Sequence, residues 1–163
     1  MSQIQVIKRD GNKEPLDLDK LHTVVNYACQ DITGVSASEV EIRSHLQFYD
    51  GIKSVDIQET IIKSTADLIS EETPGYQYVA GRLINYHVRK QVYNAFTPWP
   101  LYKLVARNVD IGMYDPALLT DWSEEEWNQL DGYIKHERDE TLTYAGMEQF
   151  RGKYLVQNRV TKE

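Results

Sequence analysis

Apolar residues recur at helical spacing in successive segments of the first hundred residues, and this pattern limits the fold more than any other feature. The segments cover about residues 17–33, 36–49, 54–69 and 74–93. Apolar positions three or four residues apart predict amphipathic helices that must bury their apolar stripes against other elements. Before them, residues 4–8 are rich in β-formers, Gly11 supplies a turn, and residues 13–16 can return as a second strand. We therefore predict a mostly helical α+β fold, with four helices packed against a small β-hairpin or sheet.

Helix start signals support these segments. Asp17 and Ser54 can each cap a helix with a side-chain oxygen. Ser36 followed by Glu39 has the spacing of a capping box. Pro74 suits the first position of the fourth helix.

The strongest break in the helical pattern is the pair Pro98 and Pro100. We place a domain boundary there and predict domains of residues 1–97 and 98–163. In the second domain we expect helices over residues 101–109, from Ser123, and over 141–150, followed by a strand over 153–156. The sequence ends at Glu163 as this new element begins, so the second domain is interpreted as the helical start of a larger, incomplete region.

Charge and hydropathy exclude several classes of protein. With 18 Lys+Arg against 25 Asp+Glu, the net charge of −7 disfavours general binding to nucleic acid or an anionic membrane. The sequence has neither an apolar run of about 18 residues nor the apolar core of a signal peptide. We expect a cytoplasmic protein that makes no direct contact with nucleic acid or membrane. Any anionic ligand must be bound by a local group of cations.

Cysteine and histidine usage limits the chemistry further. Cys29 is the single cysteine, so this sequence cannot form an intrachain disulfide, a CxxC redox pair or a cysteine-rich zinc site. The four histidines lack the HExxH spacing of a zinc protease. We predict no bound metal ion and interpret Cys29 as a small apolar residue of the first helix.

Candidate phosphate ligands are scattered along the sequence. The glycine-rich P-loop is absent, so a phosphate site needs basic side chains and a helix N-terminus. Lys8 and Arg9 at the hairpin turn, Lys20 in the first helical turn, and Lys90 late in the fourth helix could supply the charge. Each also has a structural interpretation, as a solvated strand edge, a solvated helix face, or a cation that compensates a helix dipole.

The order of these residues is more informative. The pattern V-I-K-R-D-G-x-x-E-x-x-x-x-D-K from Val6 to Lys20 resembles the signature of the ATP-cone family. The similarity continues through residues 47–53, 61–63, 74–82, 89–90 and 152–160. Together these segments resemble the N-terminal region of the large (alpha) subunit of class I aerobic ribonucleoside-diphosphate reductase.

The resemblance implies an allosteric site for overall activity, where ATP activates and dATP inhibits, with Mg²⁺ accompanying the nucleotide. At the matching positions, cations and a hydroxyl should contact the phosphates, the strand-to-helix loop should lie along adenine and ribose, and a third-helix residue should contact the sugar. The expected phosphate ligands are Lys8, Arg9, Lys20, Lys90 and Ser54. The strand-to-helix loop consists of Glu14, Pro15, Leu16, Asp17, Leu18, Asp19 and Lys20. The third-helix residue is Gln58.

Gln58 departs from the family pattern, which commonly has histidine at this position in enzymes with strong dATP control. Glutamine can still bond a sugar, but the distinction between ATP and dATP stays open. Family members from bacteriophages also depart here, which favours a phage-type protein. Two alternatives remain: a degenerate cone that acts as an assembly module without nucleotide, and a nucleotide-sensing repressor, which the absence of a cysteine-rich zinc ribbon disfavours.

The resemblance also implies what this sequence lacks. Catalysis in the family needs three cysteines in a barrel and a radical from the small (beta) subunit, so this chain alone should be inactive and should bind no catalytic cofactor. We expect it to act in deoxyribonucleotide synthesis for DNA replication together with the rest of the large subunit, on the same or another chain, and with the small subunit. Trp99, Trp122 and Trp127 could contact the rest of the large subunit, or could pack within their own domain.

Overall fold

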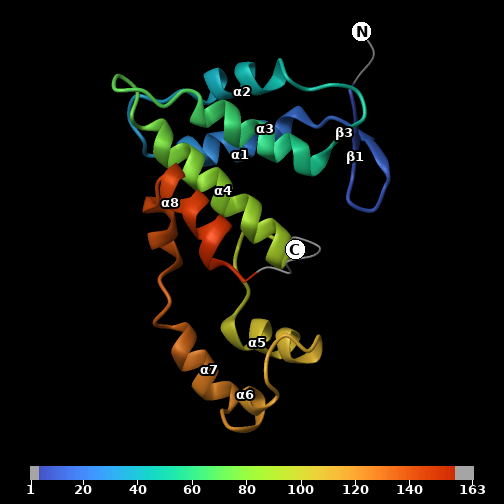
Figure 1. Ribbon diagram of the computed structural model, residues 1–163, viewed down its shortest axis with the longest axis vertical. Coiled ribbons are helices and arrows are strands. Elements are labelled where there is room, and N and C mark those ends of the chain that lie inside the picture. The colour runs from blue at the N-terminus through green and yellow to red at the C-terminus, as the bar shows by residue number, and fades with distance from the viewer. Residues whose placement is uncertain (1–3, 157–163) are drawn as a thin grey trace. The chain divides into compact units, whose positions relative to one another are not determined.

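The computed structural model describes residues 4–156 (Figure 1). Helices predominate, as predicted for an α+β fold. In chain order the elements are β1 (Gln5–Ile7), β2 (Lys13–Pro15), α1 (Leu18–Cys29), α2 (Ala37–His45), β3 (Ile52–Lys53), α3 (Ser54–Ala66), α4 (Tyr76–Tyr93), α5 (Leu101–Asp110), α6 (Ala117–Thr120), α7 (Glu124–Asp131), the 3-10 helix η1 (His136–Thr141), α8 (Tyr144–Gln149) and the π-helix η2 (Phe150–Tyr154).

Contacts within the chain define two compact units. Among the described residues, the first unit contains 4–88 and 140–156, and the second contains 89–139. The first unit therefore includes a segment that follows the second unit in sequence. The domain boundary predicted after residue 97 stays a prediction.

The sheet has the strand order β2-β1-β3. β1 and β2 form the predicted antiparallel hairpin, with Ile7 opposite Lys13. Gly11 closes its turn with φ +84°, in the left-handed region that glycine adopts readily. β3 pairs with β1 in parallel, with Ile7 opposite Lys53. The sequence did not predict β3, because two residues are too short to show an alternating pattern.

The core of the first unit is formed by the predicted apolar stripes. α2 packs against both α1 and α3. Figure 1 shows α1 and α3 lying between α2 and α4, with α8 against α4 and the strands at one end of the helices. The fully or nearly fully buried side chains include Val25, Val40, Ile52, Ile61, Tyr76, Val79, Leu83 and Ile84.

The first two helix caps form largely as predicted. Asp17 caps α1 by accepting a hydrogen bond from the Lys20 N–H at 3.0 Å, and Ser36 caps α2 by accepting from the Glu39 N–H at 3.3 Å. The other half of the capping box at Ser36 is replaced by Tyr76, whose hydroxyl accepts from the Ser36 N–H and donates to the Glu39 carboxylate. A tyrosine of α4 thus fixes the start of α2.

Two predicted helix starts were wrong. Ser54 does not cap α3: it is the first helical residue, and the N-cap residue Lys53 makes no side-chain cap bond. β3 runs straight into α3, so the extended backbone of the strand defines the helix start. Likewise α4 begins at Tyr76, two residues after Pro74, because a hydrogen-bonded turn over residues 73–76 precedes it.

The second unit contains the predicted helix over residues 101–109 as α5, and a helix from Ser123 as α7. Ser123 and Glu126 form both hydrogen bonds of a capping box. Trp99 packs against Tyr93, and the Trp127 indole N–H donates to the Leu118 carbonyl. These contacts lie within the unit.

The segment after the second unit contains the expected helix, α8, but not the expected strand. Residues 150–154 form the π-helix η2, and the Leu155 N–H bonds the Phe150 carbonyl. The strand prediction over 153–156 was therefore wrong: β-prone side chains do not form a strand without a neighbouring strand to pair with, and the described residues offer none here. Within residues 4–156, none of the helices combines the length and apolar character needed to span a bilayer.

Candidate functional site

The candidate site begins at one edge of the sheet. β1 and β3 are parallel, so both end at the same edge, and the residues that follow them are Lys8 and Ser54. Ser54 opens α3, a helix of 13 residues. The unpaired N–H groups and the positive dipole end of such a helix favour an anion. The register thus places a lysine and a hydroxyl beside a helix N-terminus.

The hairpin turn contributes a second cation, Arg9. Arg9 lies exposed in the turn that follows Lys8. Its charge reaches the buried imidazole of His87 on α4, because the pKa of His87 is lowered chiefly by burial and also by the positive charges of Arg151 and Arg9. The neighbouring Glu59 carboxylate acts in the opposite direction. His87 was missed in the sequence, where a lone histidine in a helical pattern suggests only a structural role.

The predicted lysines are ion-paired with predicted acids. The Lys8 ammonium lies 3.1 Å from the Glu14 carboxylate, and Lys20 lies 3.0 Å from Asp17. The backbone N–H of Lys20 holds the pKa of Asp17 below its usual value, and the hydrogen bond to Asp17 raises the pKa of Lys20. These pairs are solvent-exposed, so a charged ligand can compete for the lysines at low energetic cost.

The strand-to-helix loop lies at the opposite edge of the sheet from Lys8 and Ser54. β2 runs opposite to β1, and the Leu16 N–H bonds the Ile4 carbonyl, so α1 starts at the edge where β1 begins. This edge holds Asp17 and Lys20, about 10 Å along a three-residue strand from the edge of Lys8. The same strand-to-helix loop includes Pro15, Leu18 and Asp19, which are exposed, and Leu16, which is half-buried.

Two predicted ligands lie on the later helices. Gln58 is half-buried on α3, one turn after Ser54 and on the same face. Lys90 lies in the last turn of α4 and belongs to the second unit, where its ammonium donates to the Asn94 carbonyl and lies 5.6 Å from the centre of the Phe96 ring.

Comparison with known protein families identifies the family of this chain. The family model described as the ATP cone domain matches residues 4–91, more than half of the chain. The chain belongs to the ATP-cone family. The match includes every predicted nucleotide ligand, from Lys8 to Lys90.

Curated relatives of this ATP-cone protein are large subunits of one enzyme. Ribonucleoside-diphosphate reductase 1 subunit alpha of Escherichia coli is 54% identical over 158 residues, covering 97% of this chain and 21% of the relative. The alpha subunit of Haemophilus influenzae is 52% identical over 160 residues, covering 98% and 21%. That of Enterobacteria phage T4 is 39% identical over 163 residues, covering 99% and 21%. The resemblance predicted from the motifs is confirmed, and the chain spans about a fifth of the length of these relatives.

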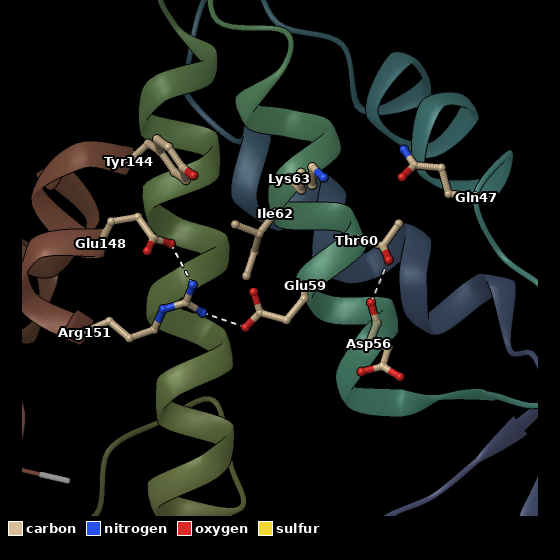
Figure 2. Close-up of a pocket in the computed structure, with 9 residues that line it drawn as sticks. All are labelled: Gln47, Asp56, Glu59, Thr60, Ile62, Lys63, Tyr144, Glu148 and Arg151. Carbon is tan, nitrogen blue, oxygen red and sulfur yellow. Dashed lines mark hydrogen bonds and ion pairs between the residues drawn. The ribbon is translucent and has the colours of Figure 1, made fainter. Parts of the chain in front are cut away.

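A cleft of about 510 Å³ lies on another face of α3 (Figure 2). At about 100° per residue, Thr60 and Lys63 lie roughly opposite Ser54 and Gln58 around the helix. The residues that line the cleft come from α3, α8, η2 and the segment after α2. They are Gln47, Asp56, Glu59, Thr60, Ile62, Lys63, Tyr144, Glu148 and Arg151. Sequence reasoning missed this cleft, because it exists only when residues 144–151 pack against α3.

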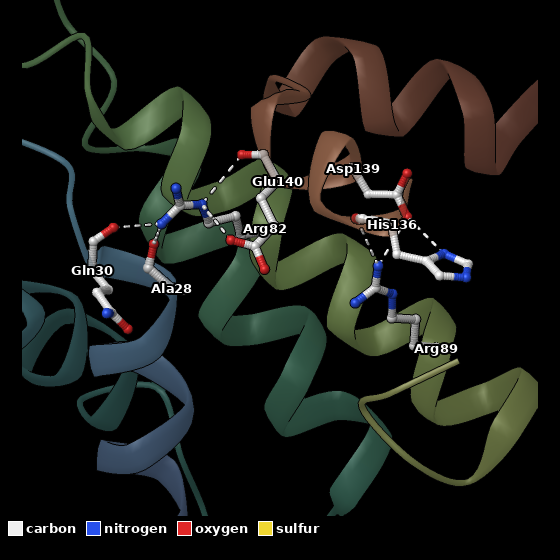
Figure 3. A network of polar contacts seen from close by, with 7 residues as sticks. All are labelled: Ala28, Gln30, Arg82, Arg89, His136, Asp139 and Glu140. Atoms are coloured by element: carbon white, nitrogen blue, oxygen red, sulfur yellow. Dashed lines mark hydrogen bonds and ion pairs between the residues drawn. The ribbon is translucent and has the colours of Figure 1, made fainter. Parts of the chain in front are cut away.

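Two arginines of α4 donate hydrogen bonds to backbone carbonyls (Figure 3). In the first unit, Arg82 donates to the Ala28 carbonyl at 3.2 Å, the Gln30 carbonyl at 2.6 Å and the Glu140 carbonyl at 3.2 Å. It thereby links the C-terminal end of α1 to residue 140, where the chain returns to the first unit; residues 140–154 are called the returning segment below.

In the second unit, Arg89 binds Asp139 at 2.9 Å and donates to the carbonyls of His136 and Phe96. Both arginines have structural roles here. Across residues 4–156 there is no cluster of three or more His, Cys, Asp or Glu side chains suited to a metal ion.

Proposed function

We propose that residues 1–97 bind an adenosine triphosphate, ATP or dATP, as the regulatory effector of a ribonucleoside-diphosphate reductase large subunit. The observation that carries the proposal is the parallel register of β1 and β3, which puts Lys8 beside Ser54 at the N-terminus of α3. The phosphates lie at this edge, with Arg9 in the adjoining turn. Charge-assisted bonds from Lys and Arg to phosphate oxygens are strong.

The adenine and ribose lie along the strand-to-helix loop. Glu14 and Asp17 present carboxylates that accept hydrogen bonds from an exocyclic amine, and the exposed side chain of Leu18 offers an apolar contact for the base. Gln58 contacts the sugar. Lys20 and Lys90 add positive charge to the phosphates, and Mg²⁺ accompanies them.

The whole enzyme is an oxidoreductase that makes deoxyribonucleotides for DNA replication in the cytoplasm. Its chemistry requires the rest of the large subunit and the radical of the small subunit. Trp122, which is 54% exposed, and the neighbouring residues of the second unit provide a contact surface for the rest of the large subunit.

A second candidate function is a cone that no longer binds nucleotide and acts as an assembly module. The observation that favours it is the pairing of Lys8 with Glu14 and of Lys20 with Asp17, which already neutralises two of the predicted phosphate ligands.

Calorimetric titration of the chain with ATP and with dATP, each with Mg²⁺, separates the two functions. We expect saturable binding. Lys8→Glu or Arg9→Glu should each weaken it at least tenfold, since a hydrogen bond to a charged group contributes about 1.5–3 kcal/mol and charge reversal adds repulsion. The matched control is Lys63→Glu, the same charge reversal on a different face of α3. Absence of heat with both nucleotides up to millimolar concentration refutes the nucleotide site.

A further inference from the structure

Glu59 joins three elements of the first unit. It lies on α3 directly after Gln58, and its carboxylate is 2.6 Å from the guanidinium of Arg151 in η2 and 3.4 Å from Nε2 of His87 on α4. Arg151 also binds Glu148 of α8 at 2.7 Å. Figure 2 shows the Arg151 side chain reaching from its own segment to both acids. The carboxylate of Glu59 is therefore the point where α3, α4 and the returning segment meet.

The returning segment, residues 140–154, is closely packed on the cone. Met147 is 6% exposed and belongs to the main core cluster. A Cβ atom on Gly81 would overlap the Leu142 carbonyl oxygen, so α4 and the segment approach at backbone distance. A shift of α3 or α4 must therefore be accommodated by this segment, because packed interiors transmit displacement.

The proposed nucleotide site reaches Glu59 by two routes. Ser54 and Gln58 occupy the first two turns of α3, so a ligand that fixes them also fixes the helix that carries Glu59. Arg9 gives the second route, since its charge opposes protonation of His87. Phosphates bound to Arg9 would screen that charge and favour the imidazolium, which binds the Glu59 carboxylate more strongly.

We propose that the Glu59–Arg151 ion pair transmits nucleotide occupancy from the cone to residues 140–154. This inference rests on the proposed nucleotide-binding function and adds the route by which binding affects another part of the chain. Arg151 is a positioning residue in this scheme. Coupling between two sites is reciprocal, so a nucleotide that tightens the docking of the segment must bind more tightly when the segment is docked.

Hydrogen exchange of the full chain, with and without ATP, tests the proposal. We expect ATP to slow exchange of the amides at residues 144–154. Arg151→Gln should abolish this response and weaken ATP binding by about fivefold, the low end of typical coupling. Arg151→Lys keeps the charge next to Glu59 and should restore part of the response. The matched control is Lys63→Gln, which removes a positive charge from the same cleft and should leave both the response and the affinity unchanged.

The outcomes separate this inference from the function beneath it. ATP binding to the wild-type chain without any change at residues 144–154 overturns the inference and leaves nucleotide binding intact. A full response in Arg151→Gln likewise overturns it. If Arg151→Lys responds no better than Arg151→Gln, the side chain has only a structural role and the proposed route is wrong. Failure of the wild-type chain to bind ATP removes both proposals.

Discussion

Gly81 lies in the middle of α4, where the backbone of residues 142–143 crosses the helix. A Cβ at this position would overlap the Leu142 carbonyl oxygen and lie 2.9 Å from the carbonyl carbon of Thr143. Neither atom belongs to a flexible side chain that could rotate away. We therefore expect Gly81→Ala to displace the returning segment from α4.

Two opposing terms set the size of the effect. Alanine is favoured over glycine inside a helix by about 1 kcal/mol. Overpacking against well-packed neighbours costs about 1–3 kcal/mol, and a segment that moves away to relieve it also exposes Met147, whose burial contributes about 1.5–3 kcal/mol. The segment is further held by the bond from Arg82 to the Glu140 carbonyl, so its displacement is resisted. Together the two costs, less the gain from alanine, give an expected net loss of about 1.5–5 kcal/mol in the free energy of unfolding.

Urea unfolding followed by circular dichroism measures this loss, and limited trypsin digestion locates it. Cleavage after Arg151 or Lys153 should become faster in Gly81→Ala than in the wild-type chain. The control is Gly146→Ala, the same chemical change in the same segment but away from the cleaved bonds, where an added Cβ comes no closer than 3.5 Å to a neighbouring atom. A Gly81→Ala chain as stable as wild type, with unchanged cleavage, would show that the close approach on α4 does not hold the segment.

Two further predictions concern buried polar groups. Tyr76→Phe should lower the free energy of unfolding by about 1–3 kcal/mol in urea unfolding, because it removes the hydroxyl that bonds Ser36 and Glu39; a loss within measurement error would contradict this. Burial lowers the pKa of His87 in the folded chain, because the buried site disfavours the imidazolium. The contribution of neutral His87 to the free energy of unfolding is complete above the pKa of an exposed histidine, about 6.5. It is lost as the pH falls towards the lower pKa of the folded state. His87→Gln should therefore flatten the fall in melting temperature between about pH 7.5 and 5, and an unchanged pH profile would refute that role for His87.

Local features of the fold were predictable because their causes are local. The hairpin requires a turn glycine between β-prone residues, and α1 requires a cap at Asp17 followed by an apolar stripe. These signals lie within about a dozen residues of each other. β3 has no such signal, since two residues show no alternating pattern, and its pairing with β1 depends on contacts between residues 46 positions apart in sequence.

The sequence predicts a set of residues for the candidate site but does not predict how they are arranged. The family pattern selected Lys8, Ser54 and Lys20, but only the register shows that Lys8 and Ser54 share an edge of the sheet while Lys20 lies at the other. The helix of the returning segment was predicted, but its packing on the cone was not. Its place on α3 and α4 depends on the missing side chain of Gly81 and on the ion pair between Glu59 and Arg151, 92 positions apart.

The acidic net charge of this chain is compatible with anion binding because its acids and bases are paired at the site. In the structure Glu14 is ion-paired with Lys8, and Asp17 is ion-paired with Lys20. Under the proposed function, a triphosphate alone takes the lysines and leaves these carboxylates without partners. An adenine nucleotide takes the lysines and also offers the exocyclic amine as a new donor to the released acids. An unpaired carboxylate beside bound phosphates is unfavourable, so this exchange of partners selects a nucleotide over a simple polyphosphate.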